Sequence, residues 1–170
     1  PVETGDYHTA CSRVFFGTTQ VPYLELDQEK LKKLGEVTVA ERLAITGVQP
    51  KISLSLNGEK GSKRLTLVGL WGDYILKPQS KEYLLMPEVE DLTMHLAALF
   101  KIETAKHALI RTSTGELAYI TKRFDRKKGK KIHVEDLCQL SQLMTEQKYN
   151  SSYERVGKII KQFASNTGLD

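Results

Sequence analysis

Residues 52–57 read ISLSLN, and this stretch gives the clearest indication of the fold class. Its aliphatic residues alternate with serine and asparagine, and a period of two is typical of a strand with one buried face. Asn57-Gly58 marks a turn, and residues 64–68 predict the second strand of a hairpin. A further short strand is predicted at residues 74–77, between the Gly72-Asp73 turn and a proline. Because turns rather than helices join these strands, the sequence predicts an antiparallel sheet.

The most regular helical pattern follows at residues 87–101. Pro87 suits a first helical turn, and acidic residues after it favour the positive end of the helix dipole. Apolar residues at helical spacing predict one buried stripe, formed by Val89, Leu92, Leu96 and Leu99. A second hairpin is then expected, with strands at 105–111 and 117–123 around a turn at 113–116.

The remaining segments predict mostly helices. Residues 1–24 look irregular, and helical segments are expected at 26–34, 39–44, 134–147 and 152–165. Ser151 or Ser152 is a plausible N-cap for the last helix, whose expected apolar stripe is Tyr153, Val156, Ile160 and Phe163. A sheet with helices segregated from it predicts the α+β class.

Composition limits the class of protein. With 170 residues, 40% hydrophobic and 27% charged, the chain has a globular composition and needs no metal or disulfide to fold. No stretch is long and apolar enough to cross a membrane, and no secretory signal is visible. Two cysteines far apart in the chain predict reduced thiols, so we expect a cytoplasmic protein without a membrane partner.

Two local features each allow two interpretations. Residues 122–131, KRFDRKKGKK, hold seven basic residues and one acidic residue, a local charge of +6 in a chain of net charge +4. This basic tract is either a solvated loop or a surface that binds phosphates. His8 and Cys11 are either half of a zinc site or an ordinary pair in which the cysteine is buried.

Four features that could bind a nucleotide occur in a fixed order. They are a glycine-containing loop at 46–51 (TGVQPK), Lys77 at the end of an apolar strand, Glu88 or Glu90 early in a helix, and a strand running into a connector at 119–126. Taken singly, each has a simpler explanation: a turn, a lysine reaching solvent, acids favouring a helix N-terminus, and a strand end. Their order is that of a kinase N-terminal lobe, in which a strand lysine paired with a helix acid contacts phosphates.

At these residues the sequence resembles the HipA-like family of serine/threonine kinase toxins, and most of all its HipT branch. The resemblance is carried by 45–51 (ITGVQPK), 74–78 (YILKP), 88–90 (EVE), 122–126 (KRFDR) and 133–139 (HVEDLCQ), and runs from about Tyr7 to Asp170. It implies a bilobal, phosphatidylinositol-kinase-like fold. Residues 1–40 would be an N-terminal segment, 41–125 the N-lobe, and 126–170 the start of a helical C-lobe.

The resemblance also implies the binding residues. Thr46, Gly47, Val48, Gln49 and Lys51 would form the loop over the ATP phosphates, and Lys77 would contact those phosphates with Glu90 as its acid partner, unless Glu88 takes that place. The backbones of Lys122 and Phe124 would meet adenine. His133 and Glu135-Asp136 would have structural roles. Thr46 would be the one loop position able to accept a regulatory phosphate.

The family's Asp-x-His-x-x-Asn catalytic loop and its metal-binding Asp do not occur before Asp170. We therefore expect no catalytic residue in this chain, which would be the ATP-binding part of a longer kinase that uses Mg²⁺. The resemblance implies a protein substrate, a HipB-like antitoxin as partner, and contact with DNA only through that antitoxin. Two alternatives remain: an interaction module that binds an antitoxin or DNA through the basic tract, and a purely structural α+β domain.

Overall fold

The computed structural model describes residues 6–24, 51–59, 62–68, 71–80, 83–127 and 130–165. The helical segments expected at 26–34 and 39–44 and the loop residues Thr46, Gly47, Val48 and Gln49 lie outside these residues. The chain divides into two compact units, the first ending at Phe124 and the second beginning at Asp125. Each unit is described by itself below.

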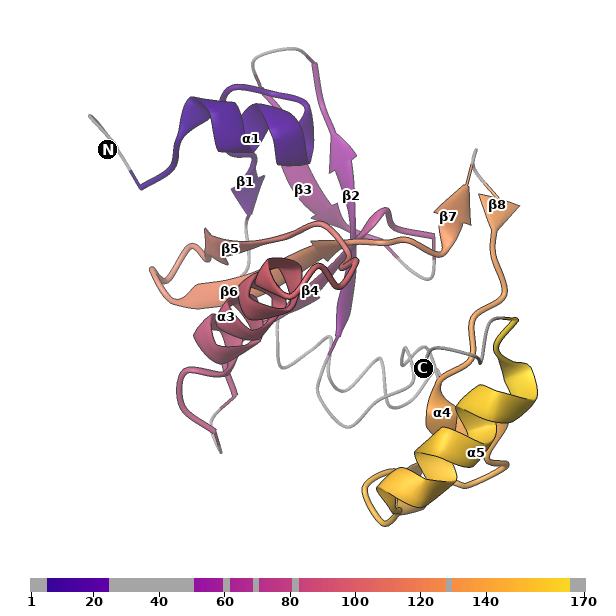
Figure 1. Ribbon diagram of the computed structural model, residues 1–170. Helices are drawn as coiled ribbons and strands as arrows, with labels where there is room; N and C mark the ends of the chain where they lie inside the picture. Colours follow the sequence, from indigo (N-terminus) through magenta and orange to yellow (C-terminus); the bar gives the residue numbers. More distant parts are fainter. Residues whose placement is uncertain are drawn as a thin grey trace. The chain divides into compact units, whose positions relative to one another are not determined.

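The first unit is built on a six-stranded sheet with the strand order β1-β3-β2-β4-β6-β5 (Figure 1). The strands are β1 (Tyr23–Leu24), β2 (Ile52–Asn57), β3 (Arg64–Leu67), β4 (Tyr74–Lys77), β5 (His107–Arg111) and β6 (Leu117–Lys122). The hairpin strands are confirmed within a residue or two at their ends. The expectation of a wholly antiparallel sheet is wrong at one edge, where β1 pairs in parallel with β3. The α+β class is confirmed.

Alternation along the strands sorts the side chains onto two faces. Leu54 lies opposite Tyr74, and Leu76 lies opposite Ile120, all on the face that carries the hydrophobic core. Lys77 and Tyr119 are the next residues along their strands, and they lie opposite one another on the other face. The sheet therefore has an apolar core on one side and charged and aromatic groups on the other.

Helix α1 (Thr9–Phe16) completes the core face, so the expectation that residues 1–24 are irregular is wrong. It buries Phe15 and Phe16, whose rings lie 5.7 and 5.8 Å from that of Tyr74. The helix ends at Gly17, which takes the left-handed conformation with φ of 71°. The apolar residues of this segment show no clear helical period in the sequence. The helix is stabilised instead by the packing of its buried side chains against the sheet.

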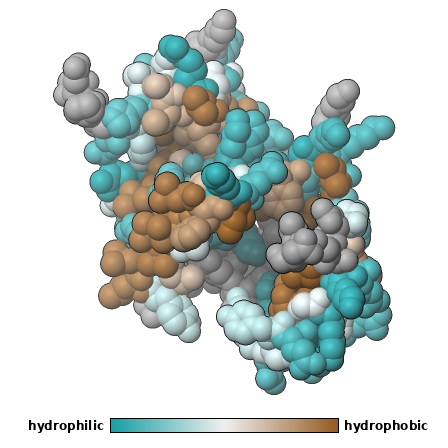
Figure 2. Space-filling view, viewed as in Figure 1, coloured by the Kyte–Doolittle hydropathy of each residue, from teal (hydrophilic) through white to brown (hydrophobic). Residues whose placement is uncertain are grey.

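Helix α3 (Met86–Leu99) covers the other face of the sheet, against β5 and β6 (Figure 1). The helix and the place of Pro87 in its first turn are confirmed, but the buried stripe is wrong. Val89, Leu92, Leu96 and Leu99 are between 46% and 78% exposed, and Figure 2 shows hydrophobic surface gathered over this helix. The sheet face beneath is polar, and it receives the side of α3 that carries Glu90 and Asp91 instead.

Among its described residues, the second unit holds a small hairpin and two α-helices. Part of the basic tract forms β7 (Arg126–Lys127) and β8 (Lys130–Lys131), which pair antiparallel. The helix expected at 134–147 is wrong, since α4 spans only Leu137–Leu140 and a 3-10 turn, η1, follows at Thr145–Gln147. Gln142 between them has a φ of 56°, a conformation that interrupts a helix.

The last helix, α5 (Tyr153–Phe163), begins as expected. Ser152 is its N-cap, and its Oγ accepts a hydrogen bond from the Arg155 amide at 3.3 Å. The apolar stripe differs, because Ile159 is the buried residue while Tyr153 is 96% exposed. Among the helices that the structure describes in either unit, none has the length and hydrophobicity needed to cross a bilayer.

Candidate functional site

Lys77 and Glu90 form the centre of the candidate site. Lys77 is the last residue of β4, and because β4 alternates, its side chain leaves the sheet on the face that α3 covers. Its Nζ pairs with Oε1 of Glu90, on the second turn of α3. The two side chains are 20% and 27% exposed, so the ion pair is partly shielded from water yet remains accessible.

The structure distinguishes the two candidate acids. Residues 88 and 90 are two positions apart, so they point to different sides of an α-helix. Glu90 reaches Lys77, while one carboxylate oxygen of Glu88 is buried without a hydrogen-bond partner among the described residues. The pairing partner of Lys77 is therefore Glu90, the acid that the resemblance favoured.

Tyr119 forms the floor beneath the ion pair. It lies opposite Lys77 in the β4–β6 register, and the Lys77 Nζ is 5.4 Å from the centre of its ring, in reach of a cation–π interaction. Tyr119 is 1% exposed, and burial first, then the charge of Glu90, raises the pKa of its hydroxyl. The neutral phenol of Tyr119 thus lies beneath the Lys77 ammonium, which Glu90 binds. Tyr119 could not be identified from the sequence, because only the strand register places it opposite Lys77.

The connector after β6 contributes backbone groups. The Lys122 amide donates to the Lys106 carbonyl at 2.8 Å, and the Arg123 amide donates to the Asp73 carbonyl at 2.8 Å. A contact between Lys122 and an adenine edge would therefore use its carbonyl oxygen rather than its N–H. Phe124 is 70% exposed at the end of the first unit.

The structure does not describe where the phosphate loop lies relative to Lys77. Thr46, Gly47, Val48 and Gln49 lie outside the described residues, and Lys51 is the first residue of the stretch that begins β2. The convergence of this loop on Lys77 therefore stays a prediction.

A separate cavity lies between α1 and the β5 edge of the sheet. It measures about 500 Å³, and its mostly apolar lining includes Phe15, Val21 and Leu109. Neither Lys77 nor Glu90 lines it. The cavity is therefore distinct from the ion pair, although His107 in its lining stacks on Tyr119.

Other residues singled out by the sequence make local contacts of their own. Cys11 is an exposed free thiol whose Sγ is 3.9 Å from Nδ1 of His8, so the expectation of a buried cysteine is wrong. His133 pairs with Glu135 at 3.2 Å on the surface.

Asp136 has the structural role expected. Its side chain caps α4 by accepting from the Gln139 amide at 2.9 Å, and it pairs with Lys148 at 2.7 Å. The hydrogen bonds from Lys148 and from the Gln139 amide lower the pKa of Asp136. The same carboxylate raises the pKa of Lys148.

Comparisons with known proteins show the family of the chain. The family model of the HipA-like C-terminal domain matches residues 43–169. A curated protein of Haemophilus influenzae named "Putative kinase" is 29% identical over 136 residues, covering 73% of this chain and 38% of that protein. "Putative kinase Y4dM" of Sinorhizobium fredii is 29% identical over 134 residues, covering 71% of this chain and 33% of that protein.

The chain spans about a third of the length of these two curated relatives. The family match, by contrast, covers most of the chain, including both acids, Lys77 and the connector. The contact between Lys77 and Glu90 is the pairing that the family resemblance led us to expect, while the parts of the loop and the connector in a nucleotide site stay predictions. The chain belongs to the HipA-like C-terminal domain family.

Proposed function

We propose that this chain binds ATP, with Mg²⁺, as the nucleotide-binding part of a HipA-like serine/threonine protein kinase toxin. The observation that carries the proposal is the Lys77–Glu90 ion pair between β4 and α3. In protein kinases a strand lysine held by a helix glutamate contacts nucleotide phosphates. The family match and two relatives named as kinases support the same assignment.

The charges around Lys77 support a nucleoside triphosphate as the ligand. Glu90 would fix the position of the Lys77 ammonium, and Tyr119 would keep that ammonium directed away from the sheet. ATP would supply the phosphoryl group, while Lys77 would neutralise charge on its phosphates. The loop 46–51 would cover the phosphates, and the carbonyl of Lys122 with the backbone of Phe124 would meet adenine in the connector between two lobes.

Nucleotide binding tests the proposal directly. Isothermal titration of the chain with ATP and Mg²⁺ should give one site, and Lys77→Ala should weaken it by at least about tenfold, since a charge-assisted contact is lost. Lys158→Ala is the matched control, because Lys158 is 75% exposed on α5, where it pairs with Glu154. Equal affinities of the wild type and Lys77→Ala would remove Lys77 from the site.

The partners remain part of the proposal. The longer protein would phosphorylate a protein substrate in the cytoplasm, bind a HipB-like antitoxin and reach DNA through that antitoxin. Its phosphoryl transfer would need a catalytic loop and metal ligands that this sequence does not contain.

One observation favours a second candidate function. Lys127, Lys130 and Lys131 are exposed on the β7–β8 hairpin, where they could contact phosphates of DNA. Direct DNA binding would weaken steeply with added salt, because each neutralised phosphate releases counterions. A titration with a short duplex at two salt concentrations distinguishes this function, and absent or salt-insensitive binding would eliminate it.

A further inference from the structure

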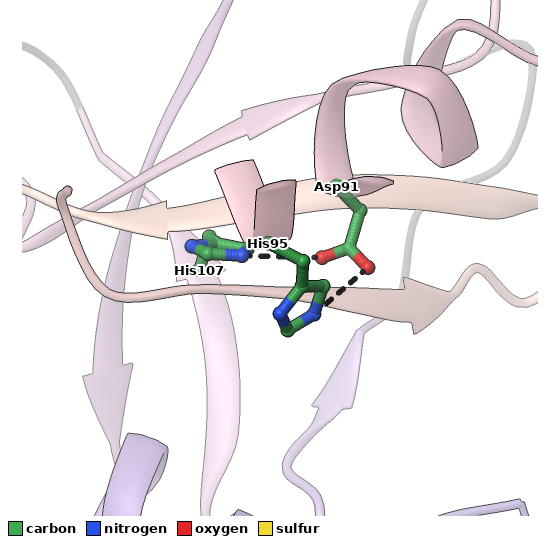
Figure 3. A group of neighbouring side chains, drawn as sticks. All are labelled: Asp91, His95 and His107. Atoms are coloured by element: carbon green, nitrogen blue, oxygen red, sulfur yellow. Dashed lines mark ion pairs between the residues drawn. The ribbon is translucent and has the colours of Figure 1, made fainter. Parts of the chain in front are cut away.

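A second polar cluster lies beside the Lys77–Glu90 pair. Asp91 and His95 are one turn apart on α3, and His107 begins β5 (Figure 3). The Nε2 atom of His95 is 3.4 Å from Oδ2 of Asp91, and the Nε2 atom of His107 is 3.7 Å from Oδ1 of Asp91. One potential ligand atom from each residue lies within 4.8 Å of the other two. The side chains therefore converge on one point between helix and strand.

The hydrogen bonding of His107 fixes which nitrogen faces that point. Its Nδ1 is 3.0 Å from the carbonyl oxygen of Ala105, and since a carbonyl only accepts, Nδ1 carries the proton. In the neutral ring Nε2 then presents a lone pair. The His107 side chain is 8% exposed, and Nε2 has no hydrogen-bond partner among the described residues. Metal-ligating histidines typically donate their second N–H to a backbone carbonyl in this way.

Asp91, on the helix, also has a buried acceptor atom, Oδ1, without a hydrogen-bond partner among the described residues. Two buried acceptor atoms thus face one another at 3.7 Å, which is longer than an N–H···O hydrogen bond. A buried acceptor without a partner is costly, so a cation between them would satisfy both.

We propose that Asp91, His95 and His107 bind a divalent transition metal of the zinc type, which fastens α3 to β5. Imidazole nitrogens with one carboxylate suit zinc, whereas Mg²⁺ prefers oxygen ligands alone. Zinc–ligand bonds of about 2.0–2.1 Å place neighbouring tetrahedral ligands roughly 3.4 Å apart. The two Asp91–histidine distances, 3.4 and 3.7 Å, are close to this value, and the exposed His95 side chain would turn toward His107 on binding, because the three ligand atoms now spread over as much as 4.8 Å. His95 is 67% exposed, so water can reach the fourth position.

The metal would influence the neighbouring site, and this step rests on the proposed function. Asp91 directly follows Glu90 on α3, while the His107 ring stacks on Tyr119, with centroids 5.9 Å apart and planes at 19°. Tyr119 in turn lies under the Lys77 ammonium. A metal that holds α3 on β5 would therefore hold Glu90 beside Lys77.

The experiment measures metal binding without nucleotide. The chain is titrated with ZnCl₂ while thermal unfolding is followed, and with CoCl₂ while its visible absorption is recorded. We expect one metal per chain, a Tm raised by several degrees, and the intense absorption of four-coordinate Co²⁺. His95→Ala and Asp91→Asn should each weaken binding by at least about tenfold, since each loses a ligand.

The variants are chosen so that folding and specificity can be separated. His95 is mostly exposed, so His95→Ala should keep the Tm of the metal-free wild type. His8→Ala is the matched control, because His8 precedes α1, contacts Cys11 and is not one of the three proposed ligands, so this variant should leave the binding unchanged. Lys77→Ala should also retain it, so that loss of nucleotide binding and loss of metal binding are read independently.

Two outcomes would overturn the proposal. One is zinc affinity that is the same in wild type, His95→Ala and Asp91→Asn, which would assign the metal to another place. The other is no zinc or cobalt binding at all, which would leave a protonated His107 as the cation that faces Asp91.

Discussion

The Lys77 ammonium and the Glu90 carboxylate pair across thirteen positions of sequence, joining the end of β4 to the second turn of α3. Both charged groups lie on the face of the sheet opposite the hydrophobic core, and the Lys77 ammonium lies over the buried ring of Tyr119. A lysine at a strand end would otherwise extend into water. Here its position is determined by a specific partner, and the nucleotide-binding proposal depends on that partner.

Glu90→Gln should lower the affinity for ATP with Mg²⁺ by about tenfold, because a neutral amide holds the ammonium less firmly than a carboxylate does. Isothermal titration measures the change. Glu88→Gln is the matched control, since Glu88 is the neighbouring acid that does not contact Lys77, and its affinity should equal that of wild type. If both variants bind ATP alike, the pair has no role in nucleotide binding.

Gly72→Ala should destabilise the first unit by about 1–3 kcal/mol, a typical cost of overpacking. A Cβ at Gly72 would lie 2.6 Å from the Leu54 carbonyl oxygen and 2.8 Å from its amide nitrogen, and those backbone atoms are fixed by the sheet. Gly72 also donates its amide to the buried Oγ of Ser53 at 3.1 Å. Urea unfolding followed by far-UV circular dichroism gives the free energy.

Gly157→Ala provides the comparison for that measurement. Gly157 lies within α5, and a Cβ there meets no atom within 4 Å. Alanine has the higher helix propensity, so this variant should be unchanged or more stable by up to about 1 kcal/mol. A Gly72→Ala protein as stable as wild type would contradict the close packing of the turn before β4 against β2.

The strands were predictable because each is a short alternating run bounded by turn residues. Ile52–Asn57 and Tyr74–Lys77 agree with the sequence because one buried face leaves a period of two. The same logic failed for α3, where apolar residues at helical spacing are exposed and the charged side packs on the sheet. Spacing identifies a helix, but which face is buried depends on the surface it meets.

The candidate site was only partly readable from sequence. Lys77 and the acids of α3 were visible as residue types in a known order, whereas Tyr119 and His107 join them only through strand register. Asp91 and His95 have the i, i+4 spacing of two ligands on one helix face, but nothing local in the sequence links them to His107, which comes from a strand beyond the helix. Local periodicity carries no information about such contacts between distant residues.

Tyr119→Phe should make the protein less sensitive to alkaline pH. Burial raises the folded pKa of Tyr119 above its ordinary value of 10.0, so above that pH the unfolded chain loses a proton that the folded chain keeps. Stability contributed by the neutral phenol is therefore complete below pH 10 and lost as pH rises further. Each pH unit should cost about 1.4 kcal/mol.

Urea unfolding at pH 9, 10 and 11 checks this slope. Tyr74→Phe would be a poor control, because burial also raises the pKa of Tyr74. Tyr23→Phe is the control, because Tyr23 is exposed. Wild type and Tyr23→Phe should lose stability in parallel, and Tyr119→Phe should lose less. Identical slopes for all three proteins would show that the Tyr119 hydroxyl titrates normally.

Asp136 should govern the acid stability of the second unit. Its pKa is lowered below the ordinary 3.8, mainly by the hydrogen bond from Lys148 and then by that from Gln139. The stabilisation is therefore present above about pH 4 and lost as pH falls through the lower, folded value. Asp136→Ala should cost about 1 kcal/mol at pH 7, because α4 loses its N-cap. Asp136→Asn keeps a capping oxygen and should cost only a few tenths of a kcal/mol.

Hydrogen exchange of the amides of α4 and α5 measures this effect within the second unit. In the wild type, the protection of these amides against exchange should fall as the pH drops below about 4 and Asp136 becomes protonated. In Asp136→Asn, protection should depend little on pH in this range. Glu154→Gln is the control, because the Glu154–Lys158 pair is 75% exposed on both sides and should contribute little. An Asp136→Asn protein with the wild-type pH dependence would mean that Lys148 does not hold this carboxylate in solution.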